Sequence, residues 1–278
     1  MRTVRIIGPG RAGRSLSSAL SRRGWKVVGL LGRDDDQTGA AAGVDVLVLA
    51  TPDDTLAEVA GGILPSASTV VVHLSGSLGL DVLAPHPRRG ALHPLVPLPT
   101  PEVGDHRLTS GVTFAVAGDP VVRDMAEALG GRAVEVADQD RAAYHAAACI
   151  AANHVVALLG QVERVAATAG LPLDAFLGLT RAAVDDVASL GPAEALTGPA
   201  RRGDWATLSR HRAALRPDER PGYNAGVALA VKLADDDRGS VVVAGGTAAD
   251  ATTDPGDDLP EVRAPLHLVH GALPVGAA

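Results

Sequence analysis

The stretch VRIIGPGRAGRSLSSAL, residues 4–20, determines the fold that we expect for this chain. Residues 4–7 are rich in Val and Ile, which is typical of a buried strand, and they lead directly into the turn Gly8-Pro9-Gly10-Arg11-Ala12-Gly13. Apolar residues then recur at helical spacing, at 12, 16, 19 and 20. A strand, a glycine turn and a helix in this order predict a site for the phosphates of a dinucleotide.

Each glycine of this turn has a physical role in such a site. Gly8 permits the tight turn, Gly10 lets a pyrophosphate approach the backbone, and Gly13 allows the helix to pack closely on the strand. The helix N-terminus offers free N–H groups and a partial positive charge to the phosphates. We therefore predict cofactor contacts from residues of three segments: Gly8, Pro9, Gly10, Arg11, Ala12 and Gly13 in the turn, Arg33 after the second strand, and Thr51 and Pro52 after the third.

The end of the second strand, LLGRDDD at residues 30–36, bears on the choice between NAD and NADP. An acid about 20 residues beyond the glycines is typical of NAD sites, whereas an arginine suits the 2′-phosphate of NADP. Arg33 stands at that place, and its guanidinium could form paired charge-assisted bonds with a phosphate. The three aspartates at 34–36 follow directly, and a carboxylate turned inward would repel the same phosphate. We predict NADP(H).

Strand and helix signals alternate through the first half of the chain and then stop. Apolar strand-like runs are expected at 4–7, 26–31, 44–50, 69–74, 91–95, 111–117 and 133–137, with helices between several of them. From Asp138, which we expect to cap a helix, the signals are helical to about residue 234. The predicted fold is α/β: a doubly wound, parallel Rossmann-type domain at 1–137, an all-helical domain at 138–234, and a disordered tail at 235–278.

Composition excludes several classes of function. The chain has 278 residues, of which 46% are hydrophobic and 21% charged, with a formal net charge of −7. The negative charge argues against a nucleic-acid binder, and the single cysteine, Cys149, fits a reducing compartment. We find neither an N-terminal leader nor a run of about 20 apolar residues, so we expect a cytoplasmic protein with no membrane partner.

Polar residues follow three of the expected strands, where open α/β sheets bind ligands. In LATPDD (49–54) we expect Asp53 or Asp54 to cap the next helix. In HLSGSLG (73–79), Ser75 and the backbone at Gly76 could hold a substrate carboxylate, and in ALHPLVP (91–97) His93 could bind or protonate an oxygen. We predict no metal site, because no cysteine or carboxylate joins the three histidines at 73, 86 and 93 in a recognisable spacing.

The first long helix of the second domain carries a polar stripe. His145, Cys149 and Asn153 are four residues apart and share one face among small apolar residues. Two interpretations stay open: hydrogen bonding between helices, or a face that closes over a nicotinamide. Farther along, LTGPARRGD (196–204) is a broken loop in which Arg202 could bind an anionic substrate or face water, while Asp204 caps the next helix.

Taken in order, the motifs GPGRAG, ATPDD, HLSGSLG, LHPL, YHAAACIAAN and LTGPARRGD resemble a bacterial family with a Rossmann-like domain and a C-terminal helical domain long described as of unknown function. The resemblance spans residues 2 to about 234. It implies the 6-phosphogluconate dehydrogenase-like superfamily, which includes pyrroline-5-carboxylate reductases, β-hydroxyacid dehydrogenases and deazaflavin-dependent NADP reductases. Some members of the family are regarded as an alternative type of ketopantoate reductase in pantothenate synthesis.

One departure from that superfamily concerns the proton donor. Related dehydrogenases use a lysine on the interdomain helix, but this chain has only Lys26 and Lys232. His145 is our candidate, because histidine exchanges protons readily near neutral pH. The resemblance implies that Asn153 orients the substrate, while Ser75 and Gly76 would hold its carboxylate with help from His93 or Arg202.

The expected activity is NADPH-dependent reduction of a small 2-oxo acid, with ketopantoate as the substrate that the resemblance implies. The alternatives are reduction of an imine such as pyrroline-5-carboxylate, a deazaflavin-linked NADP reductase, and a regulator that binds NADP(H) without catalysis. By likeness to related enzymes, we expect a homodimer formed through the helical domain and a small anionic substrate as the other partner.

Overall fold

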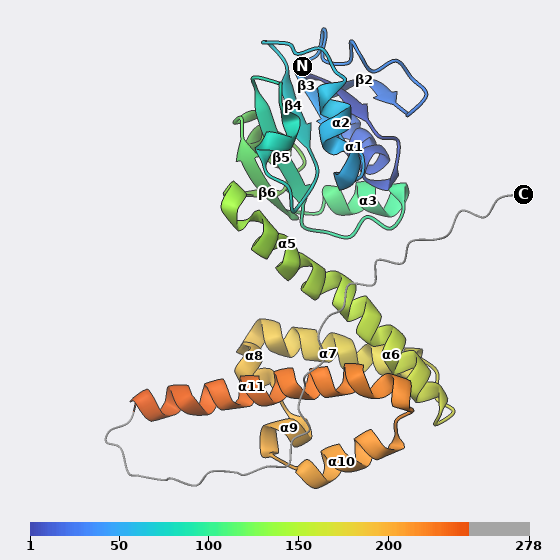
Figure 1. Ribbon diagram of the computed structural model, residues 1–278, viewed down its shortest axis with the longest axis vertical. Helices are drawn as coiled ribbons and strands as arrows, with labels where there is room; N and C mark the ends of the chain where they lie inside the picture. Colours follow the sequence, from blue (N-terminus) through green and yellow to red (C-terminus); the bar gives the residue numbers. More distant parts are fainter. Residues whose placement is uncertain (245–278) are drawn as a thin grey trace, which may run out of the picture. The chain divides into compact units, whose positions relative to one another are not determined.

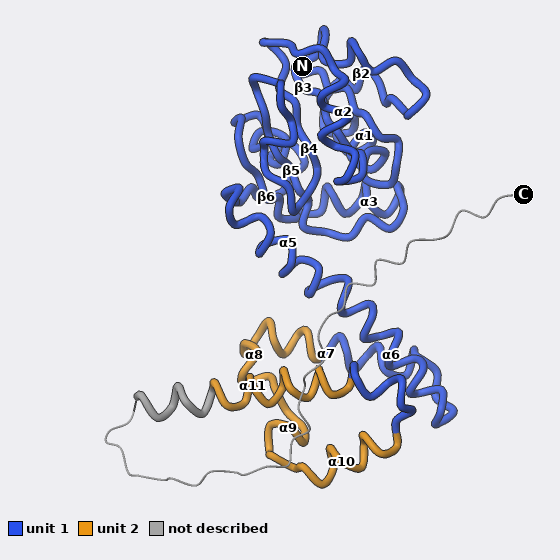
Figure 2. Tube along the Cα trace, viewed as in Figure 1, with its two compact units in different colours: residues 1–182, 215–222 blue, residues 183–214, 223–278 orange. Residues whose placement is uncertain are grey.

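The structure, a computed structural model, describes residues 1–244, and its side chains can be described up to residue 236. The chain divides into two compact units, residues 1–182 with 215–222, and residues 183–214 with 223–278 (Figure 2). The first unit contains the whole sheet and also the helices up to the middle of α7. Its boundary therefore differs from the domain boundary at Asp138 that the change of pattern suggests, which stays a prediction.

A seven-stranded sheet with the order β2-β1-β3-β4-β5-β6-β7 forms the centre of the first unit (Figure 1). Its strands are β1 (Thr3–Ile7), β2 (Lys26–Leu31), β3 (Val46–Leu49), β4 (Val70–His73), β5 (Arg89–Pro94), β6 (Thr113–Gly118) and β7 (Arg132–Glu135). The helices between them are α1 (Arg11–Arg22), α2 (Leu56–Gly61), α3 (Pro101–Leu108) and α4 (Val121–Ala128). The predicted α/β class and Rossmann-type sheet are confirmed.

The sheet is not parallel throughout. The pairs within β2-β1-β3-β4-β5 are parallel and so is β6 with β7, but β5 and β6 pair antiparallel, with Leu92 opposite Val116. The expectation of a wholly parallel sheet was wrong at this one pair. A buried apolar run such as that of β6 looks the same in either direction, so its sequence gives no information on polarity.

Side chains of the central strands alternate between two hydrophobic cores, one on each face of the sheet. In β3, Val46 and Val48 enter one core and Leu47 and Leu49 enter the other, and all four are fully buried. Helices α1 and α4 cover the first face, and α2 covers the second. Leu16 and Leu20 of α1 each contribute about 2 kcal/mol of burial to holding that helix on the sheet.

Helix α3 is an element that the sequence analysis overlooked. Thr100 caps it by accepting a hydrogen bond from the Val103 N–H, and Pro101 occupies its first turn. It packs on α1 so closely that a Cβ on Gly104 would overlap the hydroxyl of Ser15. Threonine followed by proline and glutamate is a helix-start signal, so α3 could have been predicted.

After β7 the chain forms one long helix in three parts. These are α5 (Arg141–Cys149), a π-helical turn (Ile150–His154) and α6 (Val155–Ala167). Within the helix running from Asp138 to Ala167, an 18-residue window has a mean hydropathy of 1.5 and is not buried, so by length and composition alone this helix could cross a membrane. Length and composition alone do not place a helix in a membrane, so the expectation of a cytoplasmic protein with no membrane partner stays a prediction.

The remaining helices agree with the predicted helical second half of the chain. They are α7 (Asp174–Leu190), α8 (Pro192–Ala195), α9 (Gly198–Arg202), α10 (Trp205–Ala214) and α11 (Arg220–Ala244). Asp204 accepts a hydrogen bond from the Thr207 N–H at 3.0 Å, as expected of a capping residue. Helix α11 continues to Ala244, so the tail predicted from residue 235 was wrong over its first ten residues, and residues 245–278 lie outside the described residues.

Candidate active site

The turn between β1 and α1 has the geometry that a phosphate-binding turn requires. Gly8 has a φ of +102°, and a Cβ there would lie 2.5 Å from the Ala50 carbonyl oxygen. A Cβ on Gly13 would overlap the carbonyl oxygen of Gly8, whereas one on Gly10 would meet no atom within 4 Å. The first turn of α1 has neither an acidic residue nor a side-chain cap, so its N–H groups remain available to an anion.

Thr51 and Pro52 follow β3 beside this turn. The Ala50 N–H donates to the Ile7 carbonyl oxygen at 2.8 Å, which keeps the ends of β1 and β3 side by side. The Thr51 Oγ1 atom is buried and has no hydrogen-bond partner among the described residues. A buried hydroxyl without a partner is costly, so Thr51 suits a polar ligand at this edge of the sheet.

Arg33 is exposed after β2, and within the described part of the chain it makes no hydrogen bond or ion pair. Two of the three aspartates that follow it are engaged locally: Asp35 accepts a hydrogen bond from the Gly32 N–H at 2.7 Å, and Asp36 accepts one from the Thr38 N–H at 2.9 Å. Hydrogen bonds from Thr38 lower the pKa of Asp36. These carboxylates therefore stabilise the loop that carries Arg33.

The loop after β4 is held by its own hydroxyl groups. The Ser75 hydroxyl donates to Asp53 at 2.7 Å and accepts from the N–H groups of Ser77 and Leu78, and the Ser77 hydroxyl also donates to Asp53, at 2.9 Å. Asp53 or Asp54 was expected to cap the next helix, but α2 and the short turn before it have no side-chain cap. With its hydroxyl used in this way, Ser75 shapes the loop in this structure.

Two residues at the start of α5 attach that helix to the same loop. Asp138, which lies in the turn before α5, accepts a hydrogen bond from the Leu80 N–H at 2.9 Å, so it does not cap its own helix as predicted. Arg141 is fully buried and donates to the Ser75 carbonyl oxygen at 2.7 Å. The Nε and Nη1 atoms of Arg141 are buried without a hydrogen-bond partner among the described residues, and burial lowers its pKa.

Two histidines converge on the backbone of Gly76. A Cβ built there would lie 2.6 Å from Cδ2 of His145 and 2.9 Å from Nε2 of His93. The two imidazole rings meet edge to face, with centroids 5.8 Å apart. The other nitrogen of His93, Nδ1, is 2.6 Å from the Tyr144 hydroxyl. Gly76, His93 and His145 therefore form one cluster, which contains three of the residues predicted for the site.

Burial keeps the two histidines at the strand ends neutral. Burial first, then the charge of Arg141, lowers the pKa of His73 to about 4. Burial, then the neighbouring His145 and Arg141, lowers the pKa of His93 to about 4 as well. The His73 Nδ1 atom accepts a hydrogen bond from the Ser75 N–H at 3.2 Å. At neutral pH each ring can act as a hydrogen-bond donor or acceptor but carries no charge.

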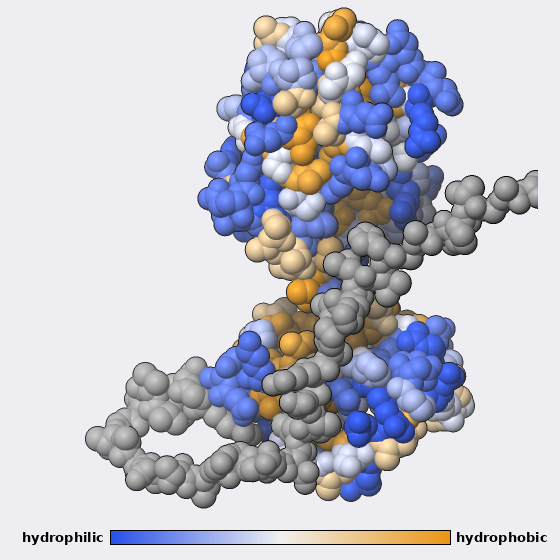
Figure 3. Space-filling view, viewed as in Figure 1, coloured by the Kyte–Doolittle hydropathy of each residue, from blue (hydrophilic) through white to orange (hydrophobic). Residues whose placement is uncertain are grey.

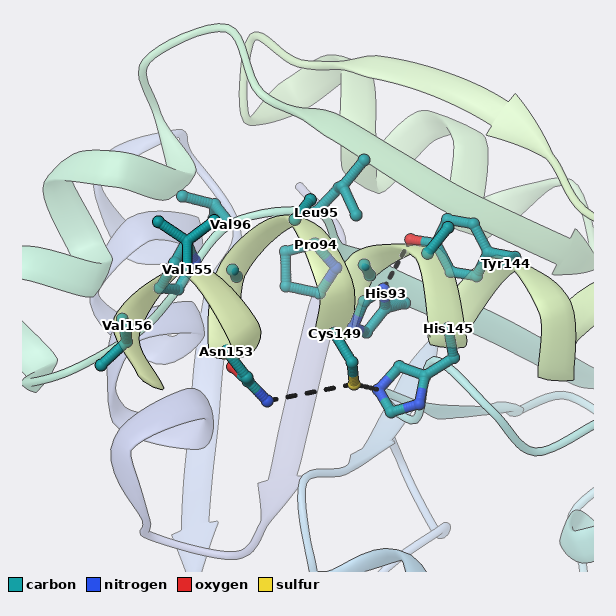
Figure 4. Close-up of a pocket in the computed structure, with 15 residues that line it drawn as sticks. His93, Pro94, Leu95, Val96, Tyr144, His145, Cys149, Asn153, Val155 and Val156 are labelled. Carbon is teal, nitrogen blue, oxygen red and sulfur yellow. Dashed lines mark hydrogen bonds between the residues drawn. The ribbon is translucent and has the colours of Figure 1, made fainter. Parts of the chain in front are cut away.

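A cavity of about 740 Å³ opens beside this cluster, between α5–α6 and the segment that follows β5 (Figure 4). One wall carries the polar stripe of the long helix: Cys149 Sγ lies 3.9 Å from His145 Nε2 and 3.9 Å from Asn153 Nδ2. The other walls are largely apolar and include Pro94, Leu95, Val96, Val155 and Val156. The π-helical turn contains Asn153, and such turns occur often at functional sites.

The structure thus brings together His93, His145 and Asn153 at one cavity, with Gly76 and Ser75 in the adjoining loop. Arg202 lies at the end of α9 in the second unit, where its charge helps to lower the pKa of Asp204. Sequence reasoning missed Arg141 and Tyr144. The signal was present, because residues 141, 144 and 145 share one face of a helix.

Two protein families match the chain in sequence. The Rossmann-like domain matches residues 2–99, and the domain of unknown function DUF2520 matches residues 110–229. No curated protein is similar enough in sequence to count as a match.

Solved structures share the fold across most of the chain. BF3122 from Bacteroides fragilis, a proposed NADP oxidoreductase, is 21% identical with a TM-score of 0.70, over 83% of this chain and 98% of that one. Protein TM1727 from Thermotoga maritima is 22% identical with a TM-score of 0.65, over 84% and 99%. Plasmodium falciparum pyrroline carboxylate reductase with NADP bound is 14% identical with a TM-score of 0.56, over 84% and 98%.

These likenesses confirm the resemblance in architecture that the ordered motifs indicate. They cover the sheet and the helices after it alike, and at such identities they show a common fold. Together with the two sequence matches, they indicate a Rossmann-like region at residues 2–99 followed by a region similar to DUF2520 at residues 110–229.

Proposed function

We propose that this protein is an NADPH-dependent reductase that converts a small 2-oxo acid to the hydroxy acid, with 2-dehydropantoate as its substrate. The observation that carries the proposal is the convergence of His93 and His145 on Gly76, at the same edge of the sheet as the glycine turn. NADPH supplies a hydride when it is bound, and the solved relatives that are NADP oxidoreductases by description support this choice of cofactor.

The residues of the turn fit a pyrophosphate. The α1 N–H groups lack a cap and an acid, and a side chain on Gly8 or Gly13 would collide with backbone atoms. Arg33 has no competing partner among the described residues, and two of its neighbouring carboxylates are bound to backbone N–H groups. Both facts favour a phosphate on the 2′ position of the adenosine ribose.

The chain's own groups have distinct roles in the proposed reduction. His145 donates a proton to the oxygen of the reduced carbonyl, and Asn153, in the same stripe, orients the substrate through its amide. His93 donates a hydrogen bond to the substrate. The backbone at Gly76 receives the substrate closely, because its missing side chain leaves room between the two imidazoles.

Electrostatics support an anionic substrate. Arg141 is fully buried, and its charge acts at the cluster, since it lowers the pKa of both His73 and His93. A positive potential at Gly76 favours a carboxylate beside the reacting carbonyl. Arg202, predicted to assist the same carboxylate, stays a prediction.

The test combines binding and turnover. Calorimetry should show NADPH bound more tightly than NADH, and Arg33→Ala should weaken NADPH by roughly 10- to 100-fold, the loss expected for a charge-assisted pair, with NADH unaffected. Arg132→Ala, which removes an exposed arginine of β7 at the other end of the sheet, is the control. The loss of NADPH absorbance is then followed with a panel of 2-oxo acids that includes 2-dehydropantoate. No turnover with any 2-oxo acid contradicts the proposal.

Reduction of a cyclic imine is the second candidate. The likeness of fold to a pyrroline carboxylate reductase favours it, and the largely apolar cavity suits such a ring. Pyrroline-5-carboxylate and a deazaflavin belong in the same panel, and turnover with either alone would assign the chain to that class. Tight NADPH binding without turnover of any compound would identify a regulator, which the missing interdomain lysine also favours.

Self-association through the helical part of the chain is a further part of this proposal. Several large apolar side chains are more than half exposed there, among them Leu158 on α6 and Leu179 on α7, and patches of apolar surface appear on the helical part of the chain (Figure 3). Contiguous exposed apolar residues mark interaction sites. A second copy of the chain is the partner that we propose for them.

A further inference from the structure

Tyr144 contacts His93, which belongs to the cluster and also lines the cavity. Its hydroxyl is 2.6 Å from Nδ1 of His93, and the two rings meet edge to face with an interplanar angle of 87°. The opposite nitrogen of His93, Nε2, faces Gly76. Tyr144 comes from α5 and His93 from β5, so this contact joins the long helix to the sheet.

A neutral imidazole has a single N–H, and its partner decides where that proton lies. The groups around His93 are Tyr144, His145 and Arg141 from α5, and Asp53 from the turn after β3. Burial raises the pKa of Tyr144, so the phenol keeps its proton. Within the described residues, the phenol hydroxyl has no acceptor other than Nδ1 of His93.

We propose that Tyr144 is a positioning residue: its hydroxyl donates to Nδ1 of His93 and so fixes the tautomer with the proton on Nε2, directed at Gly76. This inference rests on the proposed function and names how His93 takes part in it. In the opposite tautomer, Nε2 would present a lone pair to the substrate oxygen, and the two would repel.

The fixed Nε2–H gives His93 a role different from that of His145. A neutral donor aimed at a carbonyl oxygen polarises it without giving up its proton, and it stabilises the negative charge that develops there during reduction. His145 remains the group that supplies the proton. The two histidines thus act on one oxygen from neighbouring elements, one as a hydrogen-bond donor and the other as an acid.

Nuclear magnetic resonance of the full chain tests the tautomer without any substrate. Histidine side chains are labelled with ¹⁵N, and long-range ¹H–¹⁵N correlations report which ring nitrogen carries the proton. The His93 signals are identified by their loss in His93→Gln. In the wild type we expect a protonated Nε2 and an unprotonated, hydrogen-bonded Nδ1. In Tyr144→Phe, the Nδ1 signal should shift and indicate a mixture of tautomers.

The chain contains a matched control. The Tyr223 hydroxyl lies 2.9 Å from Nδ1 of His211, with the rings also edge to face. Tyr223→Phe should change the His211 signals and leave those of His93 unchanged. A wild-type His93 protonated on Nδ1, or one whose signals are the same in Tyr144→Phe, overturns the inference.

Kinetics separate this inference from the proposed function. With an active wild type, Tyr144→Phe should lower kcat by severalfold and leave the affinity for NADPH unchanged, whereas Tyr223→Phe should change neither. An unchanged kcat in Tyr144→Phe overturns the role in catalysis. A wild type that turns over no substrate contradicts the proposed function instead, and the tautomer measurement still decides what Tyr144 does.

Discussion

His145 occupies the point where the cavity, the loop after β4 and the polar stripe of the long helix meet. Its ring contacts the backbone at Gly76 on one side and lies 3.9 Å from the thiol of Cys149 on the other. No lysine is available on this helix for proton transfer. The ring is therefore the acid on which the proposed chemistry depends.

We expect His145→Ala to lower kcat by about 100-fold or more, the usual contribution of a positioned acid, with little change in NADPH affinity. The reason is that the side chain acts on the reacting oxygen and lies on the long helix, not in the glycine turn. His154→Ala is the control, because His154 is exposed on the same helix and does not line the cavity. Unchanged turnover in His145→Ala would remove this residue from the mechanism.

His73 makes stability depend on pH. Its pKa is about 4 in the folded chain and 6.5 when exposed, so between these values the unfolded chain binds more protons. The free energy of unfolding should therefore fall as the pH is lowered from about 6.5 to about 4, by up to about 3 kcal/mol from this residue. Above about pH 6.5 its contribution is constant.

Denaturant unfolding across that pH range measures this effect. In His73→Asn, the amide oxygen can replace Nδ1 as acceptor for the Ser75 N–H, and the slope of stability against pH should flatten. The slope should not vanish in this variant, because His93, whose pKa is also about 4, still makes stability depend on pH. His154→Asn, on an exposed residue, should leave the slope as it is in the wild type. A slope unchanged in His73→Asn would contradict this account.

At the scale of elements, α5 depends on its attachments to the loop after β4. Asp138→Ala removes the acceptor of the Leu80 N–H and should lower the free energy of unfolding by about 1 kcal/mol. Because α5 also carries His145, we expect kcat to fall as well. Asp140→Ala, in the same turn, makes no side-chain cap and should change both quantities less. Equal effects of the two substitutions would show that the bond to Leu80 does not hold the helix.

The sequence predicted every strand of the sheet but not the direction of the last two. Short apolar runs bounded by glycine turns indicate strands, because the backbone N–H and C=O groups of a buried segment must form hydrogen bonds. Direction depends on the connection, and recognising α3 between β5 and β6 would have favoured a parallel pair, because crossovers between parallel strands are usually helical. The antiparallel pair therefore could not be recognised from the strands themselves.

The sequence predicted only part of the candidate site, because it does not show which residues of distant segments come together. His145 and Asn153 stood out because polar residues on an alanine-rich helix face are unusual. Arg141 and Tyr144 lie on the same helix, but their partners, Ser75 and His93, are far away in sequence. Local periodicity identifies a face and cannot identify what the face meets. Asp53, which accepts a hydrogen bond from the Ser75 hydroxyl, also lies far from it in sequence, so local periodicity could not predict this hydrogen bond either.

At the scale of the whole molecule, the exposed apolar residues of the long helices predict a dimer. Light scattering after gel filtration should give twice the mass of one chain. Leu158→Glu combined with Leu179→Glu should yield monomers, because two charges would then be buried at the interface. Leu64→Glu is the control, since Leu64 is 64% exposed but follows α2 in the Rossmann-like part.

Two other outcomes would contradict the predicted dimer. A monomeric wild type at micromolar concentration contradicts the dimer. Recovery of the protein only in detergent would contradict it too, and would instead fit the helix Asp138–Ala167 with its mean hydropathy of 1.5.

Strand β7 runs in the direction opposite to β1–β5, and this direction limits where residues can be inserted into the chain. The strand ends at the edge opposite to the glycine turn, so the chain must travel back along the sheet as α5. On the way, Asp138, Arg141 and Tyr144 meet Leu80, Ser75 and His93 in turn. Inserting one residue between Asp138 and Arg141 would rotate the rest of the helix by about 100° relative to Asp138, so the three pairs could no longer form together. The length of that connection is thus constrained.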